Sequence, residues 1–227
     1  MRADSSAQPA SERVRVRRRA ERARYDLDLV HEVLDGALLC RIAFVHDGQP
    51  FIQPTLVVRQ DDQLFFHGSH TNRMFAMLCA GDPLCVEATI VDGLVLGRSV
   101  YQHSMNFRSV VVLGRGVEIV DREAKLEAML LLMERVVPGR HSQLRPLSNV
   151  ELAGTRVISM KLSECSAKVR VGPPNDTEDD LMLPSWAGEL PLRLVPGTPV
   201  PDPRLAPGTP VPDHVLEWGR SRAAFGV

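Results

Sequence analysis

The sequence predicts a mainly β fold, a small antiparallel barrel with helices placed between some of its strands. Short apolar runs are separated by tight-turn signals such as Asp47-Gly48, which is typical of strands joined in hairpins. The 227 residues are 44% apolar and 24% charged, an ordinary globular composition. Even turn spacing favours a closed barrel, which leaves no strand edge exposed, and a two-sheet sandwich is the competing architecture.

The first half of the chain is expected to form a helix followed by a meander of strands. Leucine and valine at helical spacing predict the helix over residues 25–39, with Gly36 near its end. The strands are expected at residues 38–45, 51–59 and 64–67. Met74, Met77 and Leu78 then predict a second helix, which ends before Gly81.

The second half of the chain predicts a further hairpin, a long strand and a long helix. Residues 84–91 and 94–101 are expected to pair across a turn at Asp92-Gly93. A strand over residues 107–120 follows, with Gly114 and Gly116 marking a bend. Asp121 is expected to cap a helix that Pro138-Gly139 ends, and residues 155–162 form the last clear strand.

The two ends of the chain differ from its middle. We expect a basic flexible arm over residues 1–24, a barrel domain over 25–172 and a proline-rich extension over 173–227. The extension holds eleven of the 17 prolines and repeats the heptapeptide Pro-Gly-Thr-Pro-Val-Pro-Asp at 196–202 and 207–213. Such a composition favours extended polyproline segments, and we interpret the repeat as a local duplication without a function.

The distribution of charge and the use of cysteine limit the partners and the cellular compartment that we expect for this protein. Residues 1–25 carry eight arginines and three acidic residues, and such a charge could attract nucleic acid or phosphate. No aromatic residues interleave with these arginines, so we interpret the arm as solvated and keep nucleic-acid binding as the weaker alternative. The four cysteines form no C-x-x-C pair and are expected to be reduced core residues of a cytoplasmic protein. No apolar run approaches the roughly 18 residues of a membrane span, so we expect no membrane partner.

The segment from His67 to Arg73 is the first candidate site, because it joins a strand to the following helix. Gly68 allows close backbone approach, Ser69 and Asn72 offer polar groups, and Arg73 offers a planar cation, which together suit a phosphate. The alternative is an ordinary helix cap with a solvent-facing arginine. His67 and His70 have H-x-x-H spacing, but no nearby Asp, Glu or Cys completes a ligand set, so we expect no metal site.

Two further polar clusters interrupt apolar runs. The first is a predicted loop that contains His103, Ser104, Arg108 and Ser109 and could form the lip of a ligand site. The second is an extended segment in which Lys168 and Arg170, two positions apart, lie on the same face and could hold an anion. The alternative for the first cluster is an ordinary solvent-exposed hairpin loop. The alternative for the second is a charged strand edge that prevents pairing with other sheets. No G-x-S-x-G, H-E-x-x-H, P-loop or G-x-G-x-x-G motif is present, so neither hydrolysis nor a Rossmann nucleotide site is expected.

The order of these motifs resembles that of a known family. The series runs from Phe65-Phe66-His67-Gly68-Ser69 through Ser104-Met105-Asn106-Phe107-Arg108-Ser109 to Ser166-Ala167-Lys168-Val169-Arg170. It is similar to the pyridoxamine 5′-phosphate oxidase-like superfamily of split β-barrel flavoproteins, and within it to the flavin-nucleotide-binding branch that includes nitroimidazole-resistance proteins. The likeness covers about residues 13–191.

This resemblance implies a six-stranded split barrel and a homodimer with FMN at its interface. Pro54 and Thr55 would line the flavin ring through their backbone. The phosphate and ribityl chain would be held by His67, Gly68, Ser69, Asn72 and Arg73. Ser104, Arg108 and Ser109 would approach from the partner subunit, while His103, Lys168 and Arg170 remain weaker candidates for substrate binding.

The sequence departs from the family pattern at the phosphate position. Arg73 is followed by Met74, where many members carry a lysine, and Arg108 or Lys168 could supply the missing charge. The arginine-rich C-terminal signature of a true pyridoxamine phosphate oxidase is absent, so that reaction is not assigned. The resemblance implies an FMN-dependent oxidoreductase acting on a small molecule, with a non-catalytic flavin- or haem-binding module as the alternative. His103 is a candidate proton donor or a structural histidine.

Overall fold

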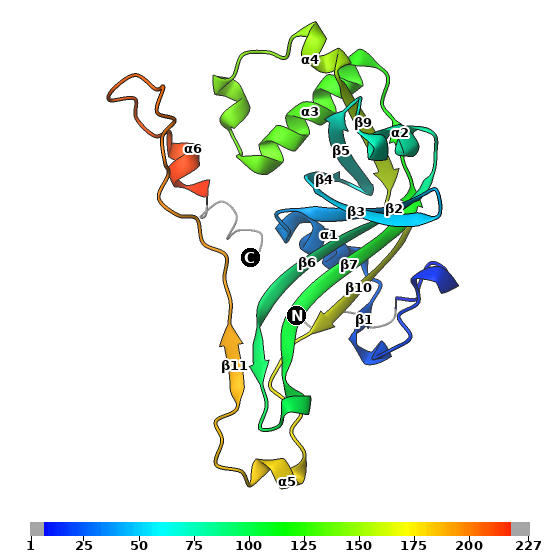
Figure 1. Ribbon diagram of the computed structural model, residues 1–227, viewed down its shortest axis with the longest axis vertical. Helices are drawn as coiled ribbons and strands as arrows, with labels where there is room; N and C mark the ends of the chain where they lie inside the picture. Colours follow the sequence, from blue (N-terminus) through cyan, green and yellow to red (C-terminus); the bar gives the residue numbers. More distant parts are fainter. Residues whose placement is uncertain (1–6, 219–227) are drawn as a thin grey trace.

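Two antiparallel sheets with helices around them make up the fold (Figure 1). The structure is a computed structural model that describes residues 7–218. One sheet has the order β1-β10-β7-β6-β2-β3, with β11 also paired to β6, and the other has the order β4-β5-β9-β8. The strands are β1 (Ala23–Arg24), β2 (Cys40–His46), β3 (Gln49–Thr55), β4 (Val57–Gln60), β5 (Gln63–Ser69), β6 (Pro83–Leu96), β7 (Ser104–Arg115), β8 (Val117–Glu118), β9 (Thr155–Lys161), β10 (Glu164–Arg170) and β11 (Gly188–Pro191). The helices are α1 (Leu27–Gly36), α2 (Arg73–Cys79), α3 (Arg122–Val136), α4 (Asn149–Ala153), α5 (Glu178–Leu181) and α6 (Asp213–Leu216), with short 3-10 turns η1 (Glu12–Val14), η2 (Ala20–Arg22), η3 (Val100–Gln102) and η4 (Arg140–Gln143).

This architecture confirms the mainly β prediction and is consistent with a split barrel. The described residues form eleven strands rather than the six expected, and the sheets do not close into one another. One extra strand arises because the run expected at residues 51–59 divides into β3 and β4, which belong to different sheets. Pro50 and Pro54 lack a backbone N–H, so β3 can lie only at a sheet edge, and the chain enters the second sheet after Thr55. The chain changes sheets again at Gly116, between β7 and β8, where a Cβ would lie 2.6 Å from the Ile158 side chain.

The hairpin expected at Asp92-Gly93 is wrong. Strand β6 runs through this dipeptide, and only a bulge between Val91 and Gly93 marks it. A Cβ on Gly93 would lie 2.8 Å from the Leu190 carbonyl oxygen, so Gly93 allows β11 to pack beside β6. The chain turns later, at η3, and β7 begins at Ser104. Ser104 therefore lies on a strand and not in a loop, whereas Arg108 and Ser109 lie within the strand predicted from residue 107.

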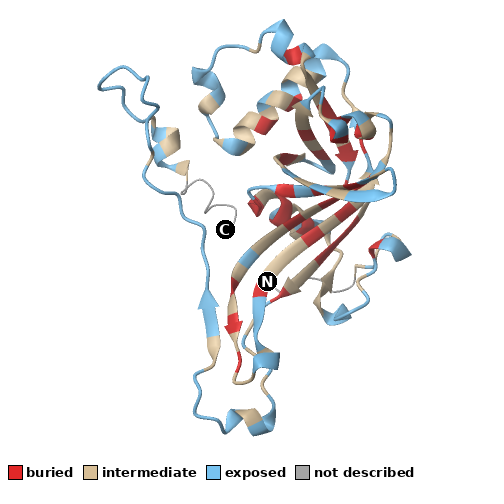
Figure 2. Cartoon of the chain, in the orientation of Figure 1, coloured by how far each residue is buried: buried red, intermediate tan, exposed pale blue. Residues whose placement is uncertain are grey.

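Helix caps and the apolar core follow the sequence closely. Side chains of Asp26, Asn72 and Asp121 accept hydrogen bonds from the first backbone N–H groups of α1, α2 and α3. Buried side chains concentrate where α1, α2 and the two sheets meet, whereas the C-terminal extension is mostly exposed (Figure 2). Within the described residues, no helix is long and apolar enough to cross a membrane.

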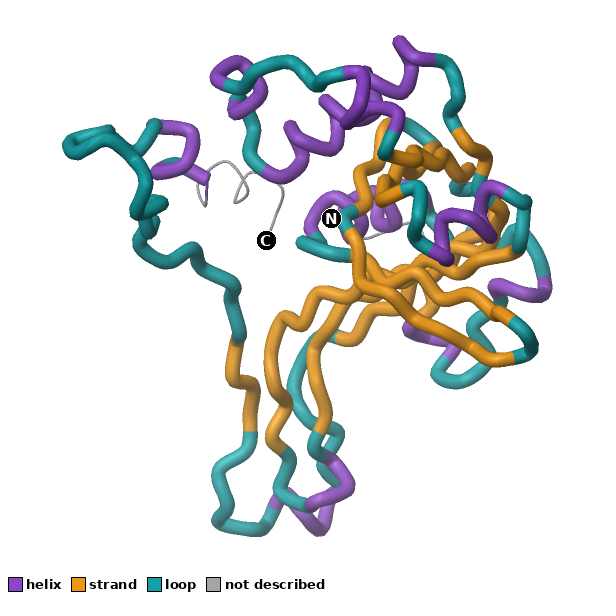
Figure 3. Tube along the Cα trace, turned by 45° about the horizontal axis from the view of Figure 1, so that its top comes forward, coloured by secondary structure: helices purple, strands orange, loops and turns teal. Residues whose placement is uncertain are grey.

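The C-terminal extension returns to the body of the molecule at two places. Strand β11 pairs with the end of β6, from Gly188 opposite Leu96 to Pro191 opposite Gly93. An extended stretch then leads to α6 (Figure 3). The indole Nε1 of Trp218 donates to the Val136 carbonyl at the end of α3, at 2.6 Å. The extension therefore links the larger sheet to the helical layer.

Candidate functional site

The expected phosphate loop lies between the end of β5 and the start of α2. Asn72 caps α2 through its side-chain oxygen, which accepts from the Met74 N–H at 2.9 Å. The hydroxyls of Ser69 and Thr71 lie 2.9 Å apart, and Ser69 is exposed. The loop thus has a defined shape with hydroxyl groups at its surface.

Arg73 supplies the positive charge of this loop. Its guanidinium carbon lies 4.2 Å from the centre of the Phe51 ring on β3, and the residue is exposed. It forms no ion pair with any residue that the structure describes. Phe51 lies on the same strand as Pro54 and Thr55, so the contact between Arg73 and Phe51 joins the loop to β3. Met74 is completely buried, so position 74 cannot present a second cation here.

Gly68 and His67 are constrained by packing behind the loop. A Cβ on Gly68 would lie 2.3 Å from the ring of Phe75, so the close approach at this glycine is made by the protein's own core. His67 is half-buried, and burial holds the pKa of its imidazole below the ordinary value. Its Nδ1 is buried without a hydrogen-bond partner among the described residues. The imidazole is therefore neutral at pH 7, with one nitrogen that no group of the described residues satisfies.

The second group of expected site residues lies on β7, in the other sheet. The Arg108 guanidinium is held by the carboxylates of Asp92, at 2.8 Å, and Glu32, and hydrogen bonding to Asp92 raises its pKa. The Ser109 hydroxyl donates to the Lys168 carbonyl at 3.4 Å, and Ser104 is exposed. No hydrogen bond or ion pair joins these residues to the His67–Arg73 loop within the described chain, so the structure does not bring the two groups together.

The three weaker candidates are dispersed. His103 is exposed, with Nδ1 2.9 Å from the Ser99 carbonyl oxygen. Lys168 donates from Nζ to the Arg18 carbonyl at 3.1 Å. Arg170 is only 5% exposed and donates to Asn106 and to the carbonyls of Gly172 and Pro173. Lys168 and Arg170 therefore do not present two free cations on one face.

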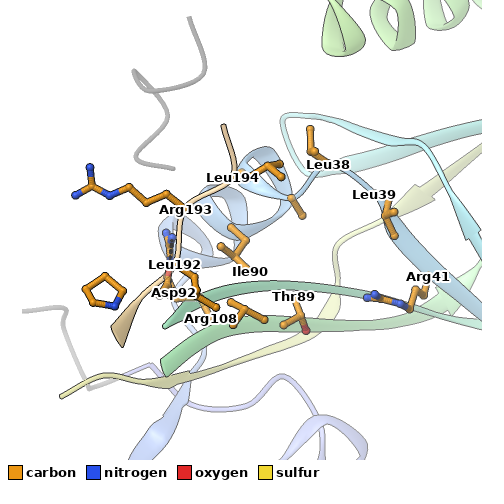
Figure 4. Close-up of a pocket in the computed structure, with 14 residues that line it drawn as sticks. Leu38, Leu39, Arg41, Thr89, Ile90, Asp92, Arg108, Leu192, Arg193 and Leu194 are labelled. Atoms are coloured by element: carbon orange, nitrogen blue, oxygen red, sulfur yellow. Dashed lines mark hydrogen bonds and ion pairs between the residues drawn. The ribbon is translucent and has the colours of Figure 1, made fainter. Parts of the chain in front are cut away.

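Sequence reasoning missed a cavity of about 620 Å³ at a gap in the larger sheet (Figure 4). Strand β2 pairs with β6 at Cys85–Glu87 and β11 pairs with it at Gly93–Leu96, so no described strand covers that edge between them. The cavity is lined by Leu38 and Leu39 before β2, Thr89 and Ile90 on β6, and Leu192 and Leu194 after β11. No local signal could have revealed it, because one wall comes from the proline-rich extension about 100 residues away in sequence.

No group of three or more His, Cys, Asp or Glu side chains suited to a metal ion occurs in the described part of the chain. The four cysteines are free thiols, and burial raises the pKa of Cys40 to about 12.

Comparison with known proteins gives three informative structural matches. The flavocytochrome Anf3 from Azotobacter vinelandii is 38% identical, with a TM-score of 0.88 over 93% of this chain and 98% of that chain. The FAD and haem binding protein from Mycobacterium smegmatis is 32% identical, with a TM-score of 0.83 over 86% and 96% of the two chains. A protein of Bacteroides thetaiotaomicron, whose name associates it with 5-nitroimidazole antibiotic resistance, is 20% identical, with a TM-score of 0.56 over 65% and 86%, and shares the fold. No curated protein sequence matches this chain.

The match to Anf3 extends well beyond the barrel, because it covers 93% of the chain. Residues 26–169 match the sequence model of the family described as pyridoxamine 5′-phosphate oxidase. This match spans more than half of the chain and includes both candidate loops. The protein belongs to the pyridoxamine 5′-phosphate oxidase-like family.

Proposed function

We propose that this protein binds a flavin nucleotide at the loop from His67 to Arg73 and uses it in an oxidoreductase reaction on a small molecule. The observation that carries the proposal is the 38% identity to a flavocytochrome over 93% of the chain, together with an exposed Arg73 that has no carboxylate partner among the described residues. A phosphate there would gain a charge-assisted hydrogen bond from Arg73, and the hydroxyls of Ser69 and Thr71 would be available as further donors. A bound flavin supplies the hydride or electron transfer, so the role of this chain's residues is to bind the flavin and to orient it toward the small molecule.

The unsatisfied nitrogen of His67 supports the same location. Its Nδ1 has no partner among the described residues, so a ligand hydroxyl or phosphate oxygen near the loop would complete its hydrogen bonding. Pro54 and Thr55 remain our candidates to line the flavin ring, because β3 adjoins the loop through Phe51 and Arg73. Ser104, Arg108 and Ser109 remain candidates to approach from a partner subunit.

The flavin is FMN or FAD, and the two can be distinguished directly. The sequence pattern favours FMN, whereas one relative at 32% identity is described as binding FAD. Purified protein should be yellow, and heat should release a flavin that chromatography and mass spectrometry identify. A colourless protein that takes up neither nucleotide would contradict the proposal. Turnover with a reduced nicotinamide and a nitroaromatic acceptor, well above that of free flavin, would establish the enzyme over a non-catalytic binding module.

We also propose that the protein acts as a homodimer with the flavin at its interface. Val45 and Ile52 on β2 and β3 are 59% and 63% exposed, which is unusual for large apolar side chains on a sheet and supports a covered face. Light scattering should give twice the chain mass of 25.1 kDa. The four free cysteines support a cytoplasmic location.

Haem binding is the second candidate function, and two matches favour it by name. In His70, the ring nitrogen Nδ1 lies 3.1 Å from the carbonyl oxygen of Gly154. In His103, Nδ1 lies 2.9 Å from the carbonyl oxygen of Ser99. A donor bond from Nδ1 leaves Nε2 unprotonated, which is the state that binds iron. A Soret band and a pyridine haemochrome would establish haem. Loss of the band in His70→Ala or His103→Ala, but not in His46→Ala, whose Nε2 faces the Asp47 carboxylate at 3.6 Å, would identify the ligand.

A further inference from the structure

The N-terminal segment contains a cavity whose charge no function described above uses. Residues of η1, η2 and β1 are held against the larger sheet: β1 pairs with β10, Val14 is buried, and the Tyr25 hydroxyl accepts the Val16 N–H at 2.9 Å. Between these elements lies a cavity of about 530 Å³. This volume falls within the roughly 300–1,000 Å³ typical of small-molecule sites.

Three arginines line this cavity, and two of them form no ion pair with a carboxylate of the described residues. The Arg15 guanidinium is paired with Glu12 at 2.8 Å. Arg24 donates to the backbone carbonyls of Ala23 and Glu21, at 2.6 and 3.0 Å, so its side chain is positioned without an ion pair to any described carboxylate. Arg17 is exposed and makes no hydrogen bond or ion pair with any residue that the structure describes, although the Glu12 carboxylate lies near enough to interact with its charge.

The remaining lining suits the uncharged part of a nucleotide. Tyr25 provides an aromatic wall, and Val16 and Ala20 provide aliphatic surface. Glu21 also lines the cavity, but its carboxylate lies 4.0 and 3.9 Å from the guanidinium groups of Arg19 and Arg22, which offset its charge. The cavity therefore combines two guanidinium groups that form no ion pair with the described residues and an apolar wall.

We propose that this cavity, which we call the N-terminal pocket, binds the phosphate groups of a small nucleotide. Arg17 and Arg24 would hold the phosphates, and Tyr25 and Val16 would contact the base or sugar. A single-stranded nucleic acid is the less suitable occupant. Such surfaces use several aromatic residues in succession, and Tyr25 is the single aromatic residue in residues 1–25. The site lies apart from the His67–Arg73 loop in the fold, so it does not depend on flavin binding.

The test is calorimetry of the full-length protein, as purified, with ADP at low ionic strength. We expect saturable binding that weakens as salt is raised, binding of pyrophosphate, and much weaker binding of adenosine. Arg17→Gln should weaken ADP binding about tenfold. Arg204→Gln, which changes an exposed arginine paired with Asp202 in the C-terminal extension, should leave it unchanged. The flavin content of Arg17→Gln should equal that of the unmodified protein.

Three results would overturn the proposal. The first is no heat from ADP or pyrophosphate at millimolar concentration. The second is an affinity for ADP that is the same in three proteins: the unmodified protein, Arg17→Gln, and the double variant that combines Arg17→Gln with Arg24→Lys. The third is a single-stranded oligonucleotide that displaces ADP at far lower concentration, which would assign these arginines to an extended polyanion surface.

Discussion

Gly68 carries a structural constraint that its position in a candidate ligand loop conceals. A Cβ there would lie 2.3 Å from the Phe75 ring, which is 1% exposed and cannot move without disturbing the core. We expect Gly68→Ala to lower the free energy of unfolding by about 1–3 kcal/mol, the usual cost of overpacking. Urea denaturation measures this. Gly197→Ala is the matched control, because a Cβ at Gly197 meets nothing within 4 Å.

Arg73 is the residue whose replacement separates ligand binding from folding. The side chain is exposed, and its recorded contact is with the Phe51 ring. Arg73→Gln should leave thermal stability nearly unchanged and weaken flavin binding by about 2 kcal/mol, through loss of a charge-assisted hydrogen bond. Fluorescence quenching of added flavin by the apoprotein gives the affinity, with Arg204→Gln as the control. An unchanged affinity would place the phosphate away from this loop.

His67 makes stability depend on pH. Burial lowers its pKa in the folded protein, so below the ordinary value of 6.5 the unfolded chain takes up a proton that the folded chain does not. Its contribution to stability is therefore complete above that pH and is lost as the pH falls. His67→Gln should show a smaller drop in unfolding free energy from pH 7 to pH 5 than the unmodified protein. The control is His103→Gln, at an exposed position, which should show the same drop as the unmodified protein. An identical drop in the His67 and His103 variants would contradict this role for burial.

At the scale of elements, the same dipeptide gives two different structures. Asp47 and Gly48 adopt positive φ angles of 50° and 75° and make the predicted turn between β2 and β3. Asp92-Gly93 lies inside β6 instead, because β11 packs against Gly93 and Arg108 binds the Asp92 carboxylate. Local sequence predicts a turn at both places, and only partners distant in sequence distinguish them.

The same distinction explains what could be predicted of the site. The caps Asn72 and Asp121 act through local hydrogen bonds, so α2, α3 and the loop before α2 follow from the sequence. Arg108 was expected to be available to a ligand, but its charge is shared with Glu32 on α1 and Asp92 on β6. Pairing between residues 76 positions apart leaves no local signal.

The packing of β11 against Gly93 can be tested by one added carbon. A Cβ at Gly93 would lie 2.8 Å from the Leu190 carbonyl oxygen, and backbone cannot rotate away as a side chain can. Gly93→Ala should therefore loosen β11. Hydrogen exchange should then become faster at the Leu192 amide, which donates to the Asp92 carbonyl at 3.0 Å. Unchanged exchange at Leu192 would show that the strands separate without loss of this bond.

On the scale of the whole molecule, the C-terminal extension completes the larger sheet. Strand β11 covers the edge of β6 at Gly93–Leu96, and residues 191–194 form one wall of the cavity at the sheet gap. An uncovered strand edge is prone to pair with other chains. Two shortened chains isolate this effect: one ends at Ala187 and lacks β11, and the other ends at Pro191 and keeps it. Both lack the Trp218 contact with Val136, so that loss cancels in the comparison.

The chain that ends at Ala187 should melt at a lower temperature and aggregate faster on heating than the chain that ends at Pro191. Differential scanning fluorimetry and light scattering measure both properties. The two chains differ only in Gly188–Pro191, a strand whose side chains are mostly exposed. Any difference therefore reports backbone pairing, edge protection and the hydrogen bond from Asn106 to Glu189 more than core burial. Equal melting and equal aggregation would mean that β11 adds nothing to the sheet. The extension would then act through its anchor at α3 instead, and the cavity wall at residues 191–194 would be held from that end alone.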